Sequence, residues 1–68
     1  MASTLSALRK ARGYTQVSLS LLVGVTANTV SRWEQGYTQP YPRYRRRLAK
    51  VLQVPKEELI FLSKKEWR

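Results

Sequence analysis

The sequence of 68 residues contains no cysteine and no histidine, and only four of its residues are acidic. The missing cysteines exclude disulfides and thiolate metal sites. The missing histidines remove a common metal ligand and the usual general base near neutral pH. Three of the four carboxylates lie in the last twelve residues, where they form no plausible acid-base or metal pair. We therefore expect no enzymatic activity, no bound metal and no cofactor.

Long apolar runs are also missing, because no stretch approaches the ~18 residues of a transmembrane helix. The N-terminus lacks the basic and then apolar layout of a signal peptide. We therefore expect a soluble cytoplasmic protein that does not contact membranes. A chain of this length is expected to form one domain and to bury only ~60% of its unfolded surface, so dimerisation is plausible.

Positive charge is abundant, with a formal net charge of +9 from thirteen basic and four acidic residues. This excess favours a polyanionic partner and a strong salt dependence of binding. Basic residues cluster in two segments without acids, at 9–12 and at 43–50. The outer face of the second segment is predicted to carry Arg43, Arg46, Arg47 and Lys50. Because these segments flank residues 15–35, the sequence predicts a surface that holds phosphates on both sides of that stretch.

Residues 15–35, TQVSLSLLVGVTANTVSRWEQ, are predicted to form two short helices joined by a tight turn. Thr15 and Thr26 are suited to cap the two helices, the second of which runs from about Ala27 to Glu34. Gly24 supplies the positive φ that a sharp turn requires. The apolar positions expected to face inward are Leu19, Val23, Val25, Val30 and Trp33.

The second of these helices leaves polar and small side chains on its outer face. Asn can pair bidentately with adenine and Arg with guanine, and small side chains can contact thymine methyl groups. The outward residues are Ala27, Asn28, Thr29, Ser31 and Arg32. An ordinary helical hairpin is the alternative interpretation, but the complete pattern together with the charge favours a helix-turn-helix that reads DNA.

The rest of the chain also reads as helix, without an alternating strand pattern. We expect helices at 3–12 and 42–52, a loop from Gln35 to Pro42, and a short fifth helix that begins near Lys56. Residues 1–60 would form the DNA-binding domain and residues 61–68 a tail. The inward residues of these helices are predicted to be Leu5, Leu8, Tyr44, Leu48, Val51, Leu52 and Leu59.

Five segments of the sequence resemble the phage-repressor/Cro family of helix-turn-helix domains, also called the xenobiotic-response-element type. They are LRKAR at 8–12, GYTQ at 13–16, VGVTANTVSRWEQG at 23–36, Pro40, and LAKVLQVPKEEL at 48–59. The resemblance implies an all-α fold, a compact five-helix lambda-repressor-like domain with the helix-turn-helix at helices 2 and 3. It also implies a transcriptional regulator, expected to be a repressor, that binds a palindromic operator in double-stranded DNA as a homodimer.

The same resemblance assigns roles to individual residues. The residues that would face base edges are Ala27, Asn28, Thr29 and Arg32. Those assigned to the DNA backbone are Gln16, Ser31, Tyr37, Thr38, Gln39 and Arg43. Arg9 and Glu34 match the positions of a structural ion pair between the first and third helices, and Gln16 would also brace the third helix, the one expected to read DNA.

One departure from the family pattern leaves other functions open. Val17, Leu21 and Leu22 occupy positions that are usually polar, and they are expected to form an exposed apolar strip. The strip is either a scatter of surface hydrophobes or a surface covered by the tail (Phe61, Leu62 and Trp67) or by another chain. A protein-interaction module or antitoxin-like regulator is therefore an alternative function, and non-specific binding of nucleic acid is a third. For a homodimer, the contact is expected within residues 59–67.

Overall fold

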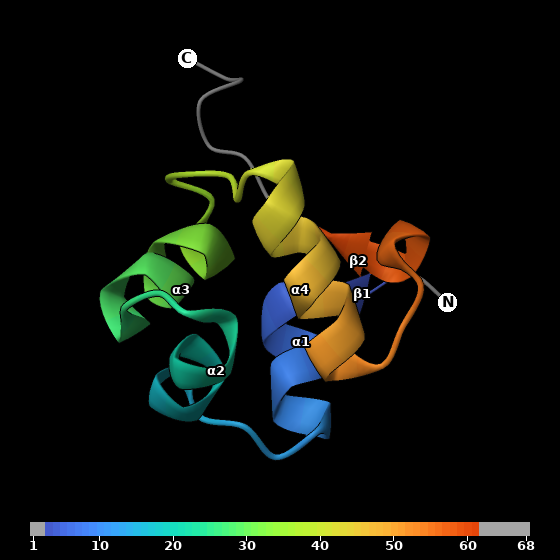
Figure 1. The fold of residues 1–68 in the computed structure, drawn as a ribbon, viewed down its shortest axis with the longest axis horizontal. Coiled ribbons are helices and arrows are strands. Elements are labelled where there is room, and N and C mark those ends of the chain that lie inside the picture. The colour runs from blue at the N-terminus through green and yellow to red at the C-terminus, as the bar shows by residue number, and fades with distance from the viewer. Residues whose placement is uncertain (1–2, 62–68) are drawn as a thin grey trace.

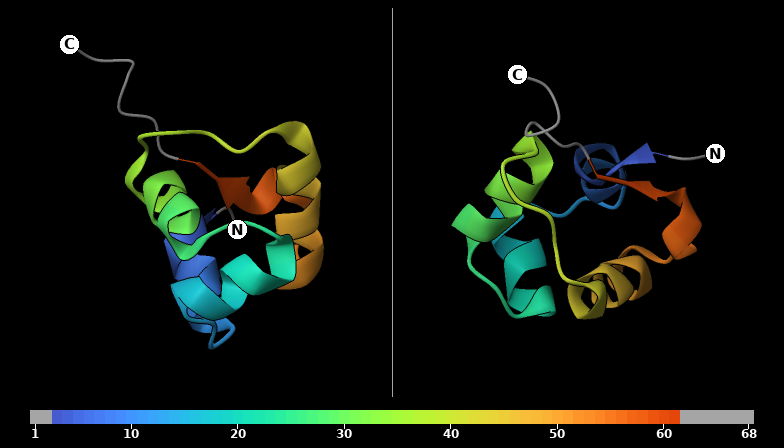
Figure 2. Two further views of the ribbon diagram at one scale, coloured as in Figure 1. Left: turned by 60° about the vertical axis from the view of Figure 1, so that its left-hand side comes forward. Right: turned by 90° about the horizontal axis from the view of Figure 1, so that it is seen from above.

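The computed structural model describes residues 3–61. Within this range the chain forms four α-helices, one turn of 3₁₀ helix (η1) and two short strands. In chain order these are β1 (Ser3–Thr4), α1 (Leu5–Ala11), α2 (Gln16–Val23), α3 (Ala27–Gln35), α4 (Pro42–Leu52), η1 (Lys56–Glu58) and β2 (Leu59–Ile60). Figures 1 and 2 show α2 and α3 on one side of the molecule and the strands on the opposite side, with α1 and α4 between them.

Threonine hydroxyls define where the first three helices begin. Thr15 accepts a hydrogen bond from the Ser18 amide at 2.9 Å, and Thr26 accepts one from the Thr29 amide at 3.1 Å. Thr4 does the same for α1. Each bond satisfies one amide that the first helical turn leaves unpaired. The predicted caps at Thr15 and Thr26 are confirmed.

Gly24 makes the turn between α2 and α3, with φ of +90°. This left-handed conformation costs other residues ~1–2 kcal/mol, so the glycine allows the two helices to meet closely. Pro42 begins α4, where its missing amide hydrogen removes no helical bond. The predicted turn at Gly24 and the predicted start of α4 are both confirmed.

The core collects apolar residues from all four α-helices and from β2. Its buried members are Leu5, Leu19, Val23, Val30, Trp33, Leu48, Leu52 and Leu59. Around them pack the partly buried Leu8, Tyr14, Val25, Tyr44, Val51, Val54 and Phe61. The Trp33 and Tyr44 rings lie 5.8 Å apart between centroids and join α3 to α4. The inward positions predicted for the helices are therefore correct, some as partial burial, and α3 is packed against the core through its inner face.

The expectation of an entirely helical chain is wrong at both ends of the described range. Ser3 and Thr4, predicted as helix, form β1, which pairs in parallel with β2 in the register Ser3–Leu59 and Thr4–Ile60. Thr4 cannot lie within α1 because it is extended and caps that helix. The predicted fifth helix is only the three-residue turn η1.

The chain is extended after η1, so consecutive side chains there alternate between the core and solvent. Leu59 is buried, Ile60 is exposed and Phe61 packs partly against the core. This alternation has the period of a strand, and isoleucine and phenylalanine both favour strands. Leu62 and Trp67, proposed as part of a cover for α2, lie outside the described residues, as does most of the dimer contact expected at 59–67.

Candidate DNA-binding surface

The exposed face of α3 carries two long polar side chains, Asn28 and Arg32. They are four residues apart, so they lie one above the other on the same face of the helix. Both are exposed. Neither side chain forms a hydrogen bond or an ion pair with another residue in the range 3–61. Their donors and acceptors are therefore available to a partner outside this part of the chain.

The shorter side chains beside them are already engaged within the helix. The Thr29 hydroxyl lies 2.8 Å from the Thr26 hydroxyl, and the Ser31 hydroxyl accepts a hydrogen bond from the Gln35 side-chain amide at 2.8 Å. Because the polar atom of Thr29 has a partner, the methyl group is the part of this side chain left for an outside contact. Ala27 and Thr29 are half-buried beside Asn28. The N-terminal end of α3 therefore offers small apolar groups next to one free amide.

A buried ion pair holds α3 from behind. Arg9 Nε donates to Glu34 Oε2 at 2.6 Å, and both side chains are 10% exposed or less. A second guanidinium nitrogen of Arg9 donates to the Tyr14 carbonyl at 2.9 Å. Gln16 Nε2 donates to Glu34 Oε1 at 3.0 Å. This network ties α1, α2 and α3 together, as the resemblance implies for Arg9, Glu34 and the bracing role of Gln16.

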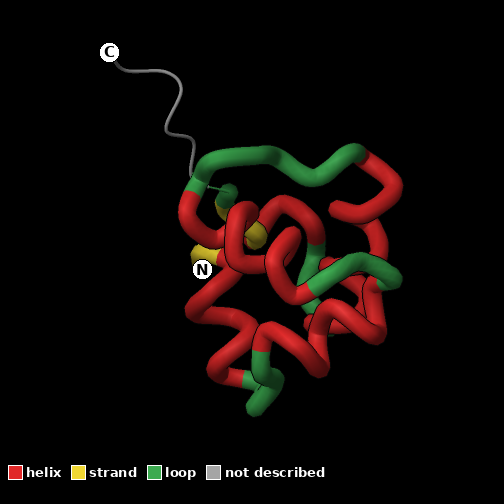
Figure 3. Tube along the Cα trace, turned by 90° about the vertical axis from the view of Figure 1, so that its left-hand side faces the viewer, coloured by secondary structure: helices red, strands yellow, loops and turns green. Residues whose placement is uncertain are grey.

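The loop from Gly36 to Tyr41 connects the C-terminal end of α3 to the start of α4 (Figure 3). Gly36, with φ of +85°, ends α3, and the Tyr37 amide donates to the Arg32 carbonyl at 3.0 Å. Tyr37 and Thr38 are exposed, and Gln39 is half-buried. The residues assigned to the DNA backbone in this loop therefore lie on one short segment beside the C-terminal end of α3.

Arg43 extends this surface on the first turn of α4. Its guanidinium carbon lies 4.9 Å from the centre of the Tyr44 ring and 5.9 Å from that of Tyr41. Stacking on aromatic rings restricts a side chain that otherwise has many rotamers. Tyr41 was not assigned a role from the sequence, because its contact with Arg43 depends on the helical geometry of α4.

The cations of the two basic segments are only partly available to a partner. Arg43, Arg46, Arg47 and Lys50 line a shallow cleft of about 390 Å³ on α4, as their shared stripe predicted. Arg47 Nη1, however, donates to the Val23 carbonyl at 2.9 Å, and Arg45 Nε donates to the Pro40 carbonyl at 3.1 Å. Arg9 is buried in its ion pair. Fewer basic side chains are therefore free to contact phosphates than a count of Lys and Arg in the sequence indicates.

The contact between Arg47 and Val23 was not predicted, because no sequence pattern pairs residues that are 24 positions apart. A glycine that ends a helix indicates an open carbonyl nearby. It does not indicate which donor fills that carbonyl.

The apolar strip predicted on α2 is exposed in the structure. Leu21 is 76% exposed, Val17 58% and Leu22 53%. Val17 and Leu21 lie one helical turn apart and so share a face. No residue in the described range buries them, which leaves exposed apolar side chains on the helix that precedes α3.

Comparison with known families identifies the family of this chain. A family model described as helix-turn-helix, of the Cro/C1 type, matches residues 5–59. The chain belongs to this helix-turn-helix family, whose members are DNA-binding regulators of transcription and not typically enzymes. Neither the curated proteins nor the solved structures gave a match to this sequence.

Two negative findings concern the part of the chain that the structure describes. None of the helices between residues 3 and 61 has the length and apolar character to cross a bilayer. In the same range there is no cluster of three or more His, Cys, Asp or Glu side chains able to hold a metal ion.

Proposed function

We propose that this chain is a sequence-specific double-stranded DNA-binding regulator, a repressor that binds a palindromic operator as a homodimer. The main support is the asymmetry of α3. Its outer face carries Asn28 and Arg32 without internal partners, whereas Val30 and Trp33 bury the inner face. An α-helix fits the major groove, where side chains of these types distinguish base pairs.

In this proposal the residues of α3 divide by chemistry. Asn28 pairs with adenine and Arg32 with guanine, each through two hydrogen bonds. Ala27 and Thr29 contact thymine methyl groups. The residues that fix the register by contacts with phosphate and sugar are Gln16, Ser31, Tyr37, Thr38, Gln39 and Arg43.

Gln16 and Ser31 each use part of their polar atoms within the protein. The side-chain amide of Gln16 donates one hydrogen to Glu34 and has a second one available. The Ser31 hydroxyl already accepts a hydrogen bond from Gln35. Palindromic half-sites would lie about one helical turn of DNA apart, as required by a dimer with two-fold symmetry.

Selection from a random duplex library is the direct test. At ordinary ionic strength the full chain should enrich one short sequence and its inverted repeat over scrambled competitors. The spacing of the repeats gives the stoichiometry, which analytical ultracentrifugation of the complex checks independently. Enrichment of no sequence would contradict specific recognition, and enrichment of a single half-site without its repeat would contradict the symmetric dimer.

A second candidate function, an interaction module for a protein partner, is favoured by the exposed strip of Val17, Leu21 and Leu22. A polar substitution at this strip should weaken the association of the chain with its protein partner or with a second copy. The fold should stay intact, because Leu21 is mostly exposed to solvent. Sedimentation of the wild type and of Leu21→Gln, with Lys10→Gln as a control on α1, measures this. Equal assembly and equal stability of the wild type and Leu21→Gln would reject the strip as an interface.

A further inference from the structure

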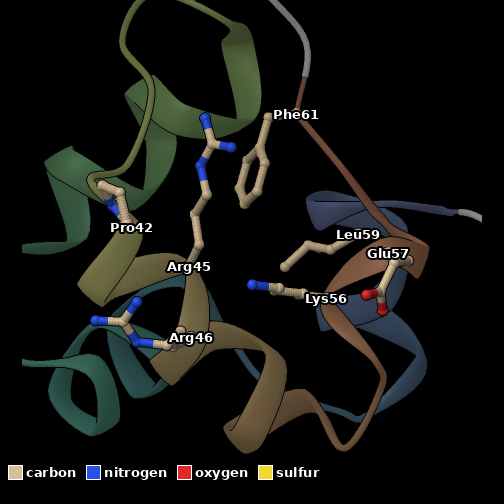
Figure 4. Close-up of a pocket in the computed structure, with 7 residues that line it drawn as sticks. All are labelled: Pro42, Arg45, Arg46, Lys56, Glu57, Leu59 and Phe61. Atoms are coloured by element: carbon tan, nitrogen blue, oxygen red, sulfur yellow. The ribbon is translucent and has the colours of Figure 1, made fainter.

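A cavity of about 330 Å³ lies between the beginning of α4 and the segment formed by η1 and β2 (Figure 4). It is separate from the outer face of α3, because none of its lining residues belongs to that helix. The lining residues are Pro42, Arg45, Arg46, Lys56, Glu57, Leu59 and Phe61. Its volume is at the lower end of the range for small-molecule sites, which suits a ligand of one or two rings.

The polar groups that face this cavity are mainly cationic. Figure 4 shows the Lys56 ammonium group pointing into the space toward α4, while the Glu57 carboxylate is turned away from it. The Lys56 ammonium group forms no hydrogen bond or ion pair with any other residue between 3 and 61. An ammonium group in this setting gains most from an anion that enters the cavity.

Arg45 is held in place beside the same space. Its Nε donates to the Pro40 carbonyl at 3.1 Å, and its guanidinium carbon lies 5.2 Å from the centre of the Phe61 ring. The two terminal nitrogens make no hydrogen bond within the described range. A fixed guanidinium with free terminal donors is suited to the planar geometry of a carboxylate.

The remaining walls of the cavity are apolar. Leu59 is buried in the core, and Phe61 and Pro42 present a ring on either side of Arg45 (Figure 4). These surfaces gain nothing from a fully hydrated anion such as phosphate, but they match the face of an aromatic ring. We propose that this cavity is a binding site for a small aromatic carboxylate, with its ring between Leu59 and Phe61 and its carboxylate between Lys56 and Arg45.

Titration of the full chain without DNA tests this site, so the result does not depend on the proposed function. The probe is 2-naphthoate, and its neutral amide, 2-naphthamide, is the matched control. In ¹H–¹⁵N spectra, naphthoate should shift the amides of residues 56–61 and of Arg45 in a saturable manner. Naphthamide should bind about tenfold more weakly, because it lacks the charge that both cations recognise. Shifts that are confined to other parts of the chain would overturn the proposal, and so would equal affinity for the two probes.

Two variants distinguish binding of naphthoate in this cavity from its general electrostatic attraction to a basic protein. Lys56→Gln should weaken naphthoate binding several-fold, whereas Lys10→Gln removes an equal charge from α1 and should leave binding unchanged. Both positions are exposed, so both variants should fold, and thermal unfolding confirms this. Equal effects of the two substitutions would mean that net charge alone determines the affinity for naphthoate, which would overturn the proposed site. The last titration uses inorganic phosphate at matched ionic strength. If phosphate bound as tightly as naphthoate, the requirement for an aromatic ring would be overturned.

Discussion

The guanidinium of Arg47 donates to the Val23 carbonyl at 2.9 Å and thereby joins the middle of α4 to the last residue of α2. A Cβ atom placed on the adjacent Gly24 would lie 3.2 Å from the same Arg47 nitrogen. The turn of the helix-turn-helix is therefore limited by two independent factors. Its backbone needs a positive φ, and its outer side is closed by a side chain from another helix.

Gly24→Ala should destabilise the protein more than Gly13→Ala. Both glycines have a positive φ, +90° and +79°, so both substitutions carry the left-handed cost of ~1–2 kcal/mol. Only the Gly24 variant also crowds Arg47, because nothing lies within 4 Å of a Cβ on Gly13. Urea unfolding measures the two free energies of unfolding. Equal losses would show that Arg47 moves aside without cost.

Glu34→Gln should be among the most damaging single substitutions on α3. It leaves the buried Arg9 guanidinium without a counter-charge, and breaking one partner of such a pair costs ~3–5 kcal/mol. The matched control is Glu57→Gln, at an exposed carboxylate, which should change the free energy of unfolding by less than ~0.5 kcal/mol. Denaturation curves compare the two variants. A small effect of Glu34→Gln would mean that hydrogen bonds alone hold α3 in place.

Asn28→Ala and Arg32→Ala should each cost ~1–3 kcal/mol of binding to the selected operator and relax the preference at one base pair. Their folding should be unaffected, because both side chains are exposed and lack internal partners. Binding to the operator and to each single-base variant gives the measurement, at one fixed salt concentration. A uniform loss on all sequences would assign that side chain to the phosphate backbone.

Thr29 offers a finer comparison, because its hydroxyl is occupied by Thr26 and its methyl group is not. Thr29→Val should keep the preference for thymine while losing ~0.5–1.5 kcal/mol of stability with the hydroxyl contact. Thr29→Ser should retain stability, because it keeps the hydroxyl, and should lose the preference for thymine, because it lacks the methyl group. Operator variants with uracil in place of thymine provide the matched substrate, because they lack only the methyl group. Loss of the preference in the valine variant would show that the hydroxyl reads the base.

The features that were predictable from the sequence are those with local causes. Thr15, Gly24 and Thr26 act through their own backbone neighbours, and Val30 and Trp33 follow the helical period. The two strands were missed for a physical reason, since two residues are too few to display an alternating pattern and their pairing joins opposite ends of the described chain. The fixed positions of Arg45 and Arg47 were missed because a basic side chain looks the same in sequence whether it faces solvent or a carbonyl.

The pairing of Ser3 with Leu59 also bears on how the protein folds. It closes a loop that contains nearly the whole described chain, and the entropy lost in closing a loop grows with its length. Helical contacts such as those between α2 and α3 join near neighbours and can form early. The small sheet should therefore assemble last and open first, and its amide hydrogens should exchange with solvent long before those of α2 and α3.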